Sequence, residues 1–417
     1  MQAIASIATL LFGIAIILIG NGLLGTLLGV RGALENFSSS TLGFIMASYF
    51  TGFVMGTFIV PKLIRRVGHI RIFAALASIA SVITMMHGLF VNPLSWVLLR
   101  LVSGICIVGL YISIESWLNE QTSNEQRGHV FSAYMTTTLI GLGLGQLLLL
   151  AGDVETLHLF ALGSILLSLG LVPVALTRVS EPVIAHAQRL GLRALYRVSP
   201  LGVVGCIFSG LGSGAFWGLG PVLAASLGLG NGGIAGFMSL TILGGIVMLW
   251  PVGRLSDRFE RRMVLTWVCV LTALAATLAS WLSGIAPLWI LLGGFVYGAF
   301  AFSIYSLSAA HTNDHVPPEQ MLEVSSSLQL LWGSGAIAGP IVAGLLMQFT
   351  TPGALLPFMA VSALLPAIFA RYRMKVAPHV QDTNRTEWTP QFATSHVALE
   401  MHPEASNEPG IHQESMT

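Results

Sequence analysis

The apolar segment at residues 94–118 carries polar side chains along one helical face. Arg100, Gly104, Tyr111 and Glu115 stand at i, i+4, i+11 and i+15, and a helix of 100° per residue places these positions within about 60° of one another. The segment is long enough to cross a bilayer, where a central charge costs roughly 2.5 to 3.5 kcal/mol even on a mild insertion scale. Arg100 and Glu115 should therefore face a wet cavity or paired protein atoms, and a carboxyl in such a cavity can exchange a proton.

Each ionisable residue of this stripe also has a purely structural interpretation. Arg100 can belong to a fixed packing ion pair, and Glu115, near one end of the segment, can bond a helix end or a loop arginine. We favour a functional role for Arg100 and leave both roles open for Glu115.

The composition shows which class of protein must position these residues. The chain has 54% hydrophobic and 9% charged residues and a mean hydropathy of +0.80, whereas charged residues make up about a quarter of a soluble domain. The sequence therefore predicts an all-α membrane protein with many spans. The first apolar run has no basic flank and is too long for a signal peptide, so we expect a retained first span.

Twelve apolar segments have the 18 or more residues that cross roughly 30 Å of hydrocarbon. The predicted spans are residues 4–30, 39–60, 72–91, 94–118, 129–150, 154–177, 200–227, 231–252, 263–283, 287–311, 323–349 and 353–371.

The basic residues of the loops predict the orientation of these spans. They gather after spans 2, 6, 8 and 12, and the alternate loops hold only Arg31. The four groups are Lys62, Arg65, Arg66 and Arg71; Arg178, Arg189, Arg193 and Arg197; Arg254, Arg258, Arg261 and Arg262; and Arg371, Arg373 and Lys375. Both termini should therefore lie in the cytoplasm.

The chain repeats itself after 194 positions. Residues 93–145 align without gaps to residues 287–339, with thirteen identities that include Gly104/Gly298, Tyr111/Tyr305, Asn119/Asn313, Gly141/Gly335 and Gly145/Gly339. Such a shift with six spans per half predicts parallel repeats related by an axis along the membrane normal. We expect six-helix bundles at residues 1–177 and 200–375, a cytoplasmic linker at 178–199 and a disordered cytoplasmic tail at 376–417.

Several other chemistries are disfavoured by the residue pattern. Cys106, Cys206 and Cys269 are isolated in apolar runs and are interpreted as packing residues. His311 and His315 have an i, i+4 spacing that could hold a metal, but without supporting ligands we favour a solvated helix end and expect no metal or cofactor. The glycine-rich runs follow no strand, which favours helix packing over nucleotide binding. A nucleic-acid partner is not indicated, and an intramembrane enzyme would need a cluster of catalytic groups that the sequence does not show.

Three motifs carry a resemblance to a known family. GRLSDRFERR, residues 253–262, concentrates six charged side chains between two apolar runs; RLVSG is found at 100–104; and GAIAGPIVAG is found at 335–344. These stretches resemble, in order, the cytoplasmic loop motif, the intramembrane arginine motif and the Gly-Pro hinge motif of the major facilitator superfamily of secondary transporters. SYFTGFVMGT, ESWLN, RGHVFSAYM and WPVGRLSDRF are most similar to the YcaD-like bacterial permeases.

The loop motif is represented unequally in the two halves. Gly253, Asp257 and Arg258 match the motif after span 8, whereas PKLIRRVGHIR after span 2 retains Arg66 and Gly68 but has Arg65 where the acid should stand. In the family such a loop latches neighbouring helices, so we expect Asp257 and Arg258 to bias the conformational equilibrium and the first half to lack a matching latch. The resemblance implies a hinge at Gly339 and Pro340.

The resemblance also implies that spans 1, 4, 7 and 10 surround a central cavity. This arrangement selects further candidates for substrate or proton binding, namely Asn21, Ser213, Trp217, Tyr297 and Tyr305, beside Arg100, Tyr111 and Glu115. Their amphipathic side chains suit a largely apolar pocket with a few orienting hydrogen bonds.

Together these features predict a monomeric multi-pass transporter of the bacterial inner membrane that moves a small molecule by alternating access. We favour proton-coupled export of an amphipathic solute, with the proton gradient as the energy source because no nucleotide-binding loop is present. Proton-driven uptake and uncoupled facilitation stay open. A transporter-like sensor that signals through the tail is the alternative from another class, and the expected partners are the small-molecule substrate and the lipid bilayer.

Overall fold

The computed structural model describes residues 2–123, 126–177, 190–317 and 320–376, together with residues 388, 391, 393–395, 397 and 398. These described residues form helices, turns and loops and no strand. Twelve helical segments are long and apolar enough to cross a membrane, which confirms the twelve predicted spans.

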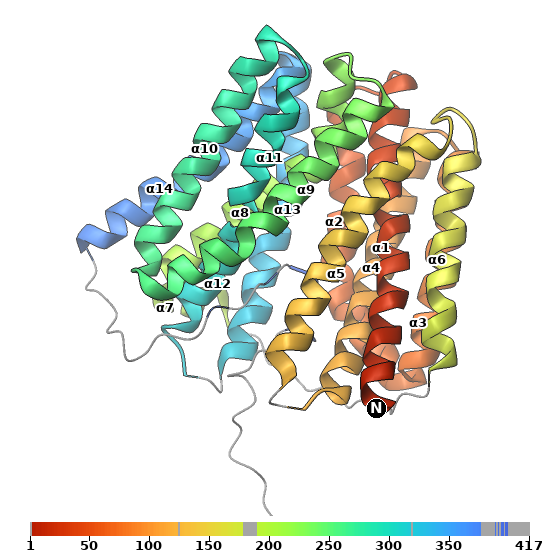
Figure 1. Cartoon of the computed structure of the whole chain (residues 1–417), viewed down its shortest axis with the longest axis horizontal. Coiled ribbons are helices and arrows are strands. Elements are labelled where there is room, and N and C mark those ends of the chain that lie inside the picture. Colours follow the sequence, from red (N-terminus) through yellow and green to blue (C-terminus); the bar gives the residue numbers. More distant parts are fainter. Residues whose placement is uncertain are drawn as a thin grey trace, which may run out of the picture.

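The helices form two bundles that stand side by side (Figure 1). The first bundle comprises α1 (Gln2–Leu34), α2 (Ser39–Val67), α3 (His69–Leu89), α4 (Pro93–Gln121), α5 (Arg127–Leu147) and α6 (His158–Leu176). The second bundle comprises α8 (Pro200–Ser226), α9 (Asn231–Arg258), α10 (Arg261–Ile285), α11 (Trp289–Ala301), α12 (Ser303–Asn313), α13 (Met321–Phe349) and α14 (Leu355–Val376). A short helix, α7 (Leu192–Val198), precedes α8, and 3-10 turns lie at Leu148–Ala151 and Pro352–Ala354.

Local sequence signals explain where several helices begin and end. The side chains of Ser38 and Asn92 accept hydrogen bonds from the backbone N–H groups of Thr41 and Ser95, at 3.2 Å and 2.9 Å, as N-cap residues do. The proline after Asn92 is the first residue of α4, where its missing N–H costs nothing. Gly68 separates α2 from α3 with a φ of 89°, a conformation that favours glycine.

The same glycine-lined crossings recur in both bundles. A Cβ atom on Gly104 would lie 2.0 Å from the carbonyl oxygen of Tyr49, and one on Gly298 would lie 1.9 Å from that of Thr241. These contacts join α4 to α2 and α11 to α9, at positions that correspond between the halves. The two backbones approach so closely that a side chain larger than hydrogen would not fit.

A second pair of glycine crossings also corresponds between the two bundles. A Cβ on Gly145 would lie 2.3 Å from the carbonyl oxygen of Ile19, and one on Gly339 would lie 2.2 Å from that of Leu211. The crossings of α5 with α1 and of α13 with α8 therefore also correspond. The internal repeat seen in the sequence is thus a repeat of helix packing, and the fold is the predicted pair of pseudo-symmetric six-helix bundles.

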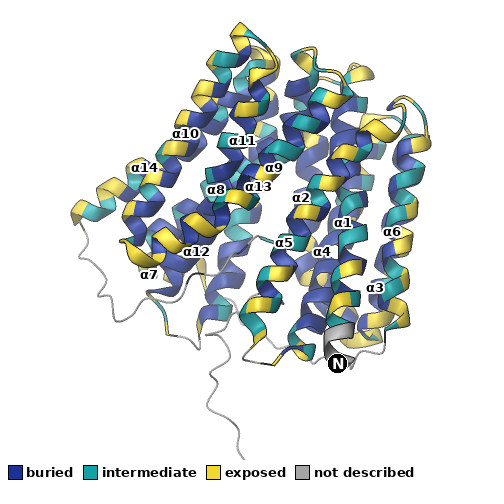
Figure 2. Cartoon of the chain, in the orientation of Figure 1, coloured by how far each residue is buried: buried dark blue, intermediate teal, exposed yellow. Residues whose placement is uncertain are grey.

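The outer faces of the bundles remain apolar. Leu94, Leu176, Trp281 and Phe349 are among the large apolar side chains that are exposed, and exposed residues follow the outer helix faces in Figure 2. An apolar exterior of this extent suits contact with lipid, in which all backbone polar groups must be paired within helices.

The ends of α2, α9 and α14 and the short helix α7 carry the described residues of the basic clusters and lie at one end of the molecule (Figure 1), which we call the arginine-rich end; the opposite end is the far end. At the far end the bundles touch closely. A Cβ on Gly43 of α2 would lie 2.3 Å from the carbonyl oxygen of Pro340 of α13, and Ser239 of α9 donates a 3.1 Å hydrogen bond to the carbonyl oxygen of Gly143 of α5. A third contact brings Gly29 of α1 against Pro221 of α8.

The structure corrects one expected span. Residues 287–311 were expected to form a single helix, but the helix is interrupted at Phe302 between α11 and α12. The Phe302 N–H reaches the Gly298 carbonyl at 3.5 Å, a long contact, and the three glycines of α11 weaken the preceding turns. The interruption places the Phe302 ring beside Trp217.

The tail contains residues that contact the bundles. Trp388, Ser395 and Val397 are 6%, 3% and 1% exposed, so the disorder expected from residue 376 onward is wrong at these positions. Residues 178–189 of the expected linker, and most of the expected tail, lie outside the described residues.

Candidate functional site

A cavity of about 160 Å³ lies between the two bundles. A volume of this size resembles an engineered cavity of about 150 Å³ that admits a benzene molecule. The first bundle contributes Asn21, Gly22, Gly25, Thr26, Met46, Tyr49, Phe50, Phe53, Arg100, Tyr111, Thr138, Leu139, Leu142 and Gln146. The second bundle contributes Ser209, Ser213, Trp217, Gly218, Phe302, Tyr305 and Trp332. The C-terminal segment, a name that we use for the described residues 388, 391, 393–395, 397 and 398, contributes Ala393 and Thr394.

Arg100 is the charged side chain of this lining. It is 5% exposed, and its guanidinium carbon lies 4.2 Å from the centre of the Tyr49 ring, within the range of a cation–π interaction. Among the described residues no carboxylate forms an ion pair with Arg100, and its Nε atom has no hydrogen-bond partner. The fixed packing ion pair considered from the sequence is therefore not formed within that part of the chain.

Glu115 lies on the same helix, toward the arginine-rich end. The separation of fifteen positions between Arg100 and Glu115 corresponds to about 22 Å of helix, so the two side chains do not pair with each other. Glu115 is fully buried; the Tyr134 hydroxyl donates to its Oε1 atom at 2.7 Å, and the Ser395 hydroxyl donates to its Oε2 atom. These two partners are neutral, so they leave the carboxyl free to exist with or without a proton.

The second bundle presents aromatic rings to the cavity. Trp217 and Phe302 are stacked, with ring centres 6.0 Å apart and planes 3° apart. Trp332 contacts Tyr305 within its own bundle and Phe50 across the cavity, with ring centres 6.3 Å and 6.0 Å apart. Such rings offer an apolar surface for a flat or apolar molecule.

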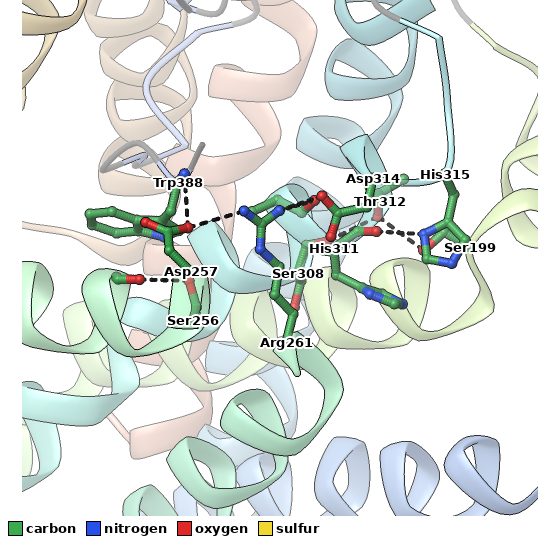
Figure 3. A network of polar contacts seen from close by, with 12 residues as sticks. Ser199, Ser256, Asp257, Arg261, Ser308, His311, Thr312, Asp314, His315 and Trp388 are labelled. Atoms are coloured by element: carbon green, nitrogen blue, oxygen red, sulfur yellow. Dashed lines mark hydrogen bonds and ion pairs between the residues drawn. The ribbon is translucent and has the colours of Figure 1, made fainter. Parts of the chain in front are cut away.

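A network of charged groups joins the helix ends of the second bundle at the arginine-rich end (Figure 3). Arg261 is 2% exposed and pairs with Asp314 at 2.6 Å and with Asp257 at 3.2 Å. Arg261 also donates to the Ala310 carbonyl at 2.9 Å. The backbone N–H of Trp388 donates to Asp257 Oδ1 at 3.1 Å, so the C-terminal segment joins this network.

The fold and this site can be compared with known proteins. The family model described as Major Facilitator Superfamily matches residues 10–190 and 202–401, which together cover most of the chain. The chain belongs to the major facilitator superfamily. Its members' alternating-access fold and the twelve apolar helices make this chain a multi-pass membrane transporter.

Relatives and solved structures agree with this membership. Two relatives from Salmonella newport (strain SL254) and Salmonella typhimurium (strain LT2), each named uncharacterized MFS-type transporter YcaD, are 29% identical over 341 residues, covering 81% of this chain and 88% of theirs. The predicted similarity to YcaD-like permeases is confirmed.

Two solved structures show the same fold. The nucleoside transporter NupG matches with a TM-score of 0.71 and 16% identity, covering 89% of this chain and 99% of its own. A bacterial homologue of the human lysosomal transporter Spinster, inward-facing and occupied, matches with a TM-score of 0.66 and 16% identity, covering 91% and 98%.

Within this superfamily fold, most of the predicted site residues meet at the cavity. Asn21, Arg100, Tyr111, Ser213, Trp217 and Tyr305 all line it. Glu115 lies beside it, bonded to Ser395, the neighbour of the lining residue Thr394. The expectation for Tyr297 is wrong, because Tyr297 does not line the cavity but packs inside the second bundle, with its ring centre 6.2 Å from that of Phe216.

The predicted latch is assembled differently from the expectation. Asp257 pairs with Arg261, whereas Arg258 is exposed and forms no ion pair within the described part of the chain. The physical reason is the turn between α9 and α10: Arg261 is the first residue of α10, and the turn at Phe259 and Glu260 brings it back beside Asp257, whereas Arg258 is exposed at the end of α9. Gly253 lies under the Trp388 indole, where a Cβ would come within 2.1 Å of the ring.

The remaining motif residues have structural positions. Arg66 is exposed near the end of α2, and Gly68 forms the turn that follows. Gly339 makes the close crossing with α8, and Pro340 meets Gly43 at the contact between the bundles. The expected hinge residues Gly339 and Pro340 thus lie at close helix contacts, and their role as a hinge stays a prediction.

The structure corrects the interpretation of the histidine pair. His311 is 6% exposed rather than solvated, because α12 ends inside the charged network; its carbonyl oxygen lies 2.7 Å from the His315 ring nitrogen Nδ1. Groups of three or more residues that could hold a metal do not occur within the described ranges.

Sequence reasoning missed several residues of the site. Tyr49, Phe50 and Trp332 belong to spans 2 and 11, which the resemblance did not assign to the cavity. Tyr134 lies nineteen positions from its partner Glu115, too far for a helical spacing to reveal the pair. An aromatic residue near the middle of a span was the one available signal, and many lipid-facing positions share it.

Proposed function

We propose that this protein is a proton-coupled exporter of a small amphipathic molecule in a bacterial inner membrane, with both termini in the cytoplasm. The observation that carries this proposal is Glu115, a fully buried carboxyl held by two hydroxyl groups beside a cavity between two bundles. A carboxyl with neutral partners can bind a proton in one orientation of the bundles and release it in another.

The arrangement of the bundles supports alternating access. In the far half the bundles touch through helix pairs that include α2 with α13, α5 with α9 and α1 with α8, and residues of the C-terminal segment lie between them at the other end. This arrangement fits a state that opens toward the arginine-rich end. Clustered Lys and Arg residues at that end favour the cytoplasm.

The lining of the cavity supports an amphipathic substrate. Aromatic rings form one wall, and Asn21, Ser209, Ser213 and Gln146 supply hydrogen-bonding groups. Sites of this kind bind molecules that are mainly apolar and carry a few polar groups.

Export can be tested in cells that lack their own efflux systems. We expect the protein to lower the accumulation of a subset of amphipathic fluorescent compounds, and a protonophore to abolish this effect. Glu115→Gln should remove the dependence on the proton gradient. Glu120→Gln is the matched control because Glu120 lies on the same helix and is exposed.

The outcomes separate the alternatives. Gradient-driven extrusion that survives in Glu115→Gln would exclude Glu115 as the coupling site. Accumulation that rises with the proton gradient would indicate uptake, and equilibration that ignores the gradient would indicate a facilitator.

A sensor is the second candidate, because residues of the C-terminal segment line the cavity and could respond to a ligand there. A chain that ends at Val376 should still transport if the protein is a pump. Loss of a cellular response together with absence of transport by the full chain would favour a sensor.

A further inference from the structure

We infer that the substrate is an organic anion, with its negative group held by Arg100 and its apolar body packed on the aromatic wall of the second bundle. This inference rests on the proposed transport function and adds the charge of the molecule that is carried.

Arg100 supplies the argument for a negative group. Its side chain is more than nine-tenths buried and lines the cavity. Its guanidinium lies over the Tyr49 ring, its Nε has no hydrogen-bond acceptor, and no carboxylate among the described residues forms an ion pair with it. A buried guanidinium without a counter-ion is costly, and a planar carboxylate matches its fork of N–H donors.

The opposite wall supplies the argument for an apolar body. Trp217 and Phe302 stack beside each other, and Trp332 reaches across to Phe50. The cavity admits about one aromatic ring. A molecule with a negative group at one end and a ring at the other would therefore satisfy both walls.

Other charge classes fit this lining less well. The described lining residues include no Asp or Glu that could neutralise a cation, and a cation would be repelled by Arg100. A neutral molecule would leave the guanidinium without an ionic partner.

The test compares probes of one shape and three charges on the purified full-length protein. Benzoate, benzamide and benzylammonium, with their naphthalene counterparts, are titrated by calorimetry and by thermal unfolding, because a ligand of the folded state raises the unfolding temperature. We expect the carboxylates to bind about 10- to 100-fold more tightly than the amides. Arg100→Gln should erase this preference and Arg100→Lys should keep part of it.

Arg66→Gln is the matched control, since Arg66 is an exposed arginine of the same bundle. Equal binding of the three charge classes, no binding by any probe, or an anion preference that survives in Arg100→Gln would overturn the inference. Gradient-driven export of neutral or cationic compounds would leave the transporter proposal in place and remove the anion class alone.

A separate set of contacts points to a second role, for the C-terminal segment. The Trp388 ring packs on Gly253, and its centre lies 6.4 Å from that of the Trp250 ring. The backbone N–H of Trp388 donates a hydrogen bond to Asp257. These contacts attach the segment to the second bundle at the arginine-rich end.

Seven to ten residues later the segment reaches the first bundle. The Ser395 hydroxyl donates to Glu115 and accepts from the Val397 N–H at 3.1 Å. Val397 and Ala398 are buried in the core of the first bundle. Between the two attachments, Ala393 and Thr394 form part of the cavity lining.

We propose that this segment is a plug in cis that closes the arginine-rich mouth of the cavity and covers Glu115. Because its two attachments lie on different bundles, the segment must release at least one of them when the bundles move apart or a solute passes.

Labelling of a cavity cysteine tests the plug without a known substrate. Ser213→Cys is placed in a chain whose Cys106, Cys206 and Cys269 are replaced by alanine, and a membrane-impermeant maleimide is added from the arginine-rich side of inside-out vesicles. We expect the chain that ends at Val376 to be labelled several-fold faster than the full chain, with the Trp388→Ala, Ser395→Ala double variant also faster.

An Arg258→Cys variant is the control, because Arg258 is exposed outside the cavity and its labelling rate should not depend on the segment. Equal rates at Ser213→Cys in the full chain, the truncated chain and the double variant would overturn the plug. If truncation prevents folding, the labelling rate of the double variant in the full chain still tests whether the segment closes the cavity.

Discussion

The two bundles share the same close helix crossings at glycines, which we call the packing frame. They differ in the polar and charged side chains that they place around the cavity. The glycine crossings of α4 with α2 and of α5 with α1 recur at corresponding positions in the second bundle. At the positions that match Arg100 and Glu115, however, the second half has Gly294 and Ala309. The first bundle therefore supplies Arg100 and Glu115, whereas both bundles contribute aromatic rings to the cavity lining.

The helix ends at the arginine-rich end show the reverse asymmetry. The second bundle has a buried network in which Arg261 joins Asp257 to Asp314. In the first bundle Arg65 and Arg66 are exposed, and neither forms an ion pair with a described residue. The two halves therefore share their backbone packing and differ in where their charged side chains lie.

The largest effect is expected from breaking the shared frame. A Cβ on Gly52 would lie 1.8 Å from the Leu101 carbonyl oxygen, and one on Gly244 would lie 2.0 Å from that of Phe295. Gly52→Leu and Gly244→Leu should each prevent recovery of folded protein, because overpacking moves one backbone away from another. Size-exclusion chromatography of detergent-solubilised protein measures this yield.

Gly284→Leu is the control for these two variants, since a Cβ there meets no atom within 4 Å. Recovery of well-folded protein from one of the two variants and not the other would show that the frame is not shared.

The next effect tests the asymmetry at the helix ends. Arg261→Ala leaves Asp314 buried without its partner, and breaking a buried ion pair costs about 3 to 5 kcal/mol. Arg65→Ala at the exposed position of the first bundle should change stability by less than about 0.5 kcal/mol. Thermal or denaturant unfolding in the same detergent compares the two variants, and equal losses would contradict the asymmetry.

The smallest effect concerns the hydroxyl that holds Glu115. Tyr134→Phe removes a 2.7 Å hydrogen bond and should lower the free energy of unfolding by about 1 kcal/mol. The position that matches Tyr134 in the second bundle is Leu328, which has no hydroxyl to lose, so Leu328→Met serves as the comparison. An unchanged unfolding temperature in Tyr134→Phe would mean that this bond does not stabilise the folded state.

The sequence was sufficient to predict the twelve helices and the two-bundle fold, because the length of the apolar segments, the charge of the loops and the 194-residue repeat are local or periodic signals. It also placed Arg100, Tyr111 and Tyr305 on the cavity, since their helices face the centre in each half. It placed Tyr297 wrongly because a place on a cavity-lining helix does not decide which face of that helix a residue occupies, and the Tyr297 ring packs on Phe216 inside the bundle.

Contacts between distant segments could not be read from the sequence. The bond from Ser395 to Glu115 joins residues 280 positions apart, and the polar composition around Ser395 suggested disorder. Trp332 and Phe50 meet across the two bundles, so their proximity depends on how the bundles dock rather than on any helical period.

The central claim is that the two bundles rock about the cavity, closing one end as the other opens. The direct measurement is the distance between spin labels, obtained by double electron–electron resonance. The labels are placed on exposed positions, one pair at Arg66 and Arg258 and another at Leu34 and Ser226. Gly43→Trp serves as a wedge at the far-end contact with Pro340. The account predicts that the wedge lengthens the distance from Leu34 to Ser226 and shortens that from Arg66 to Arg258. Distances that both lengthen, or an unchanged distance at the arginine-rich end, would contradict it.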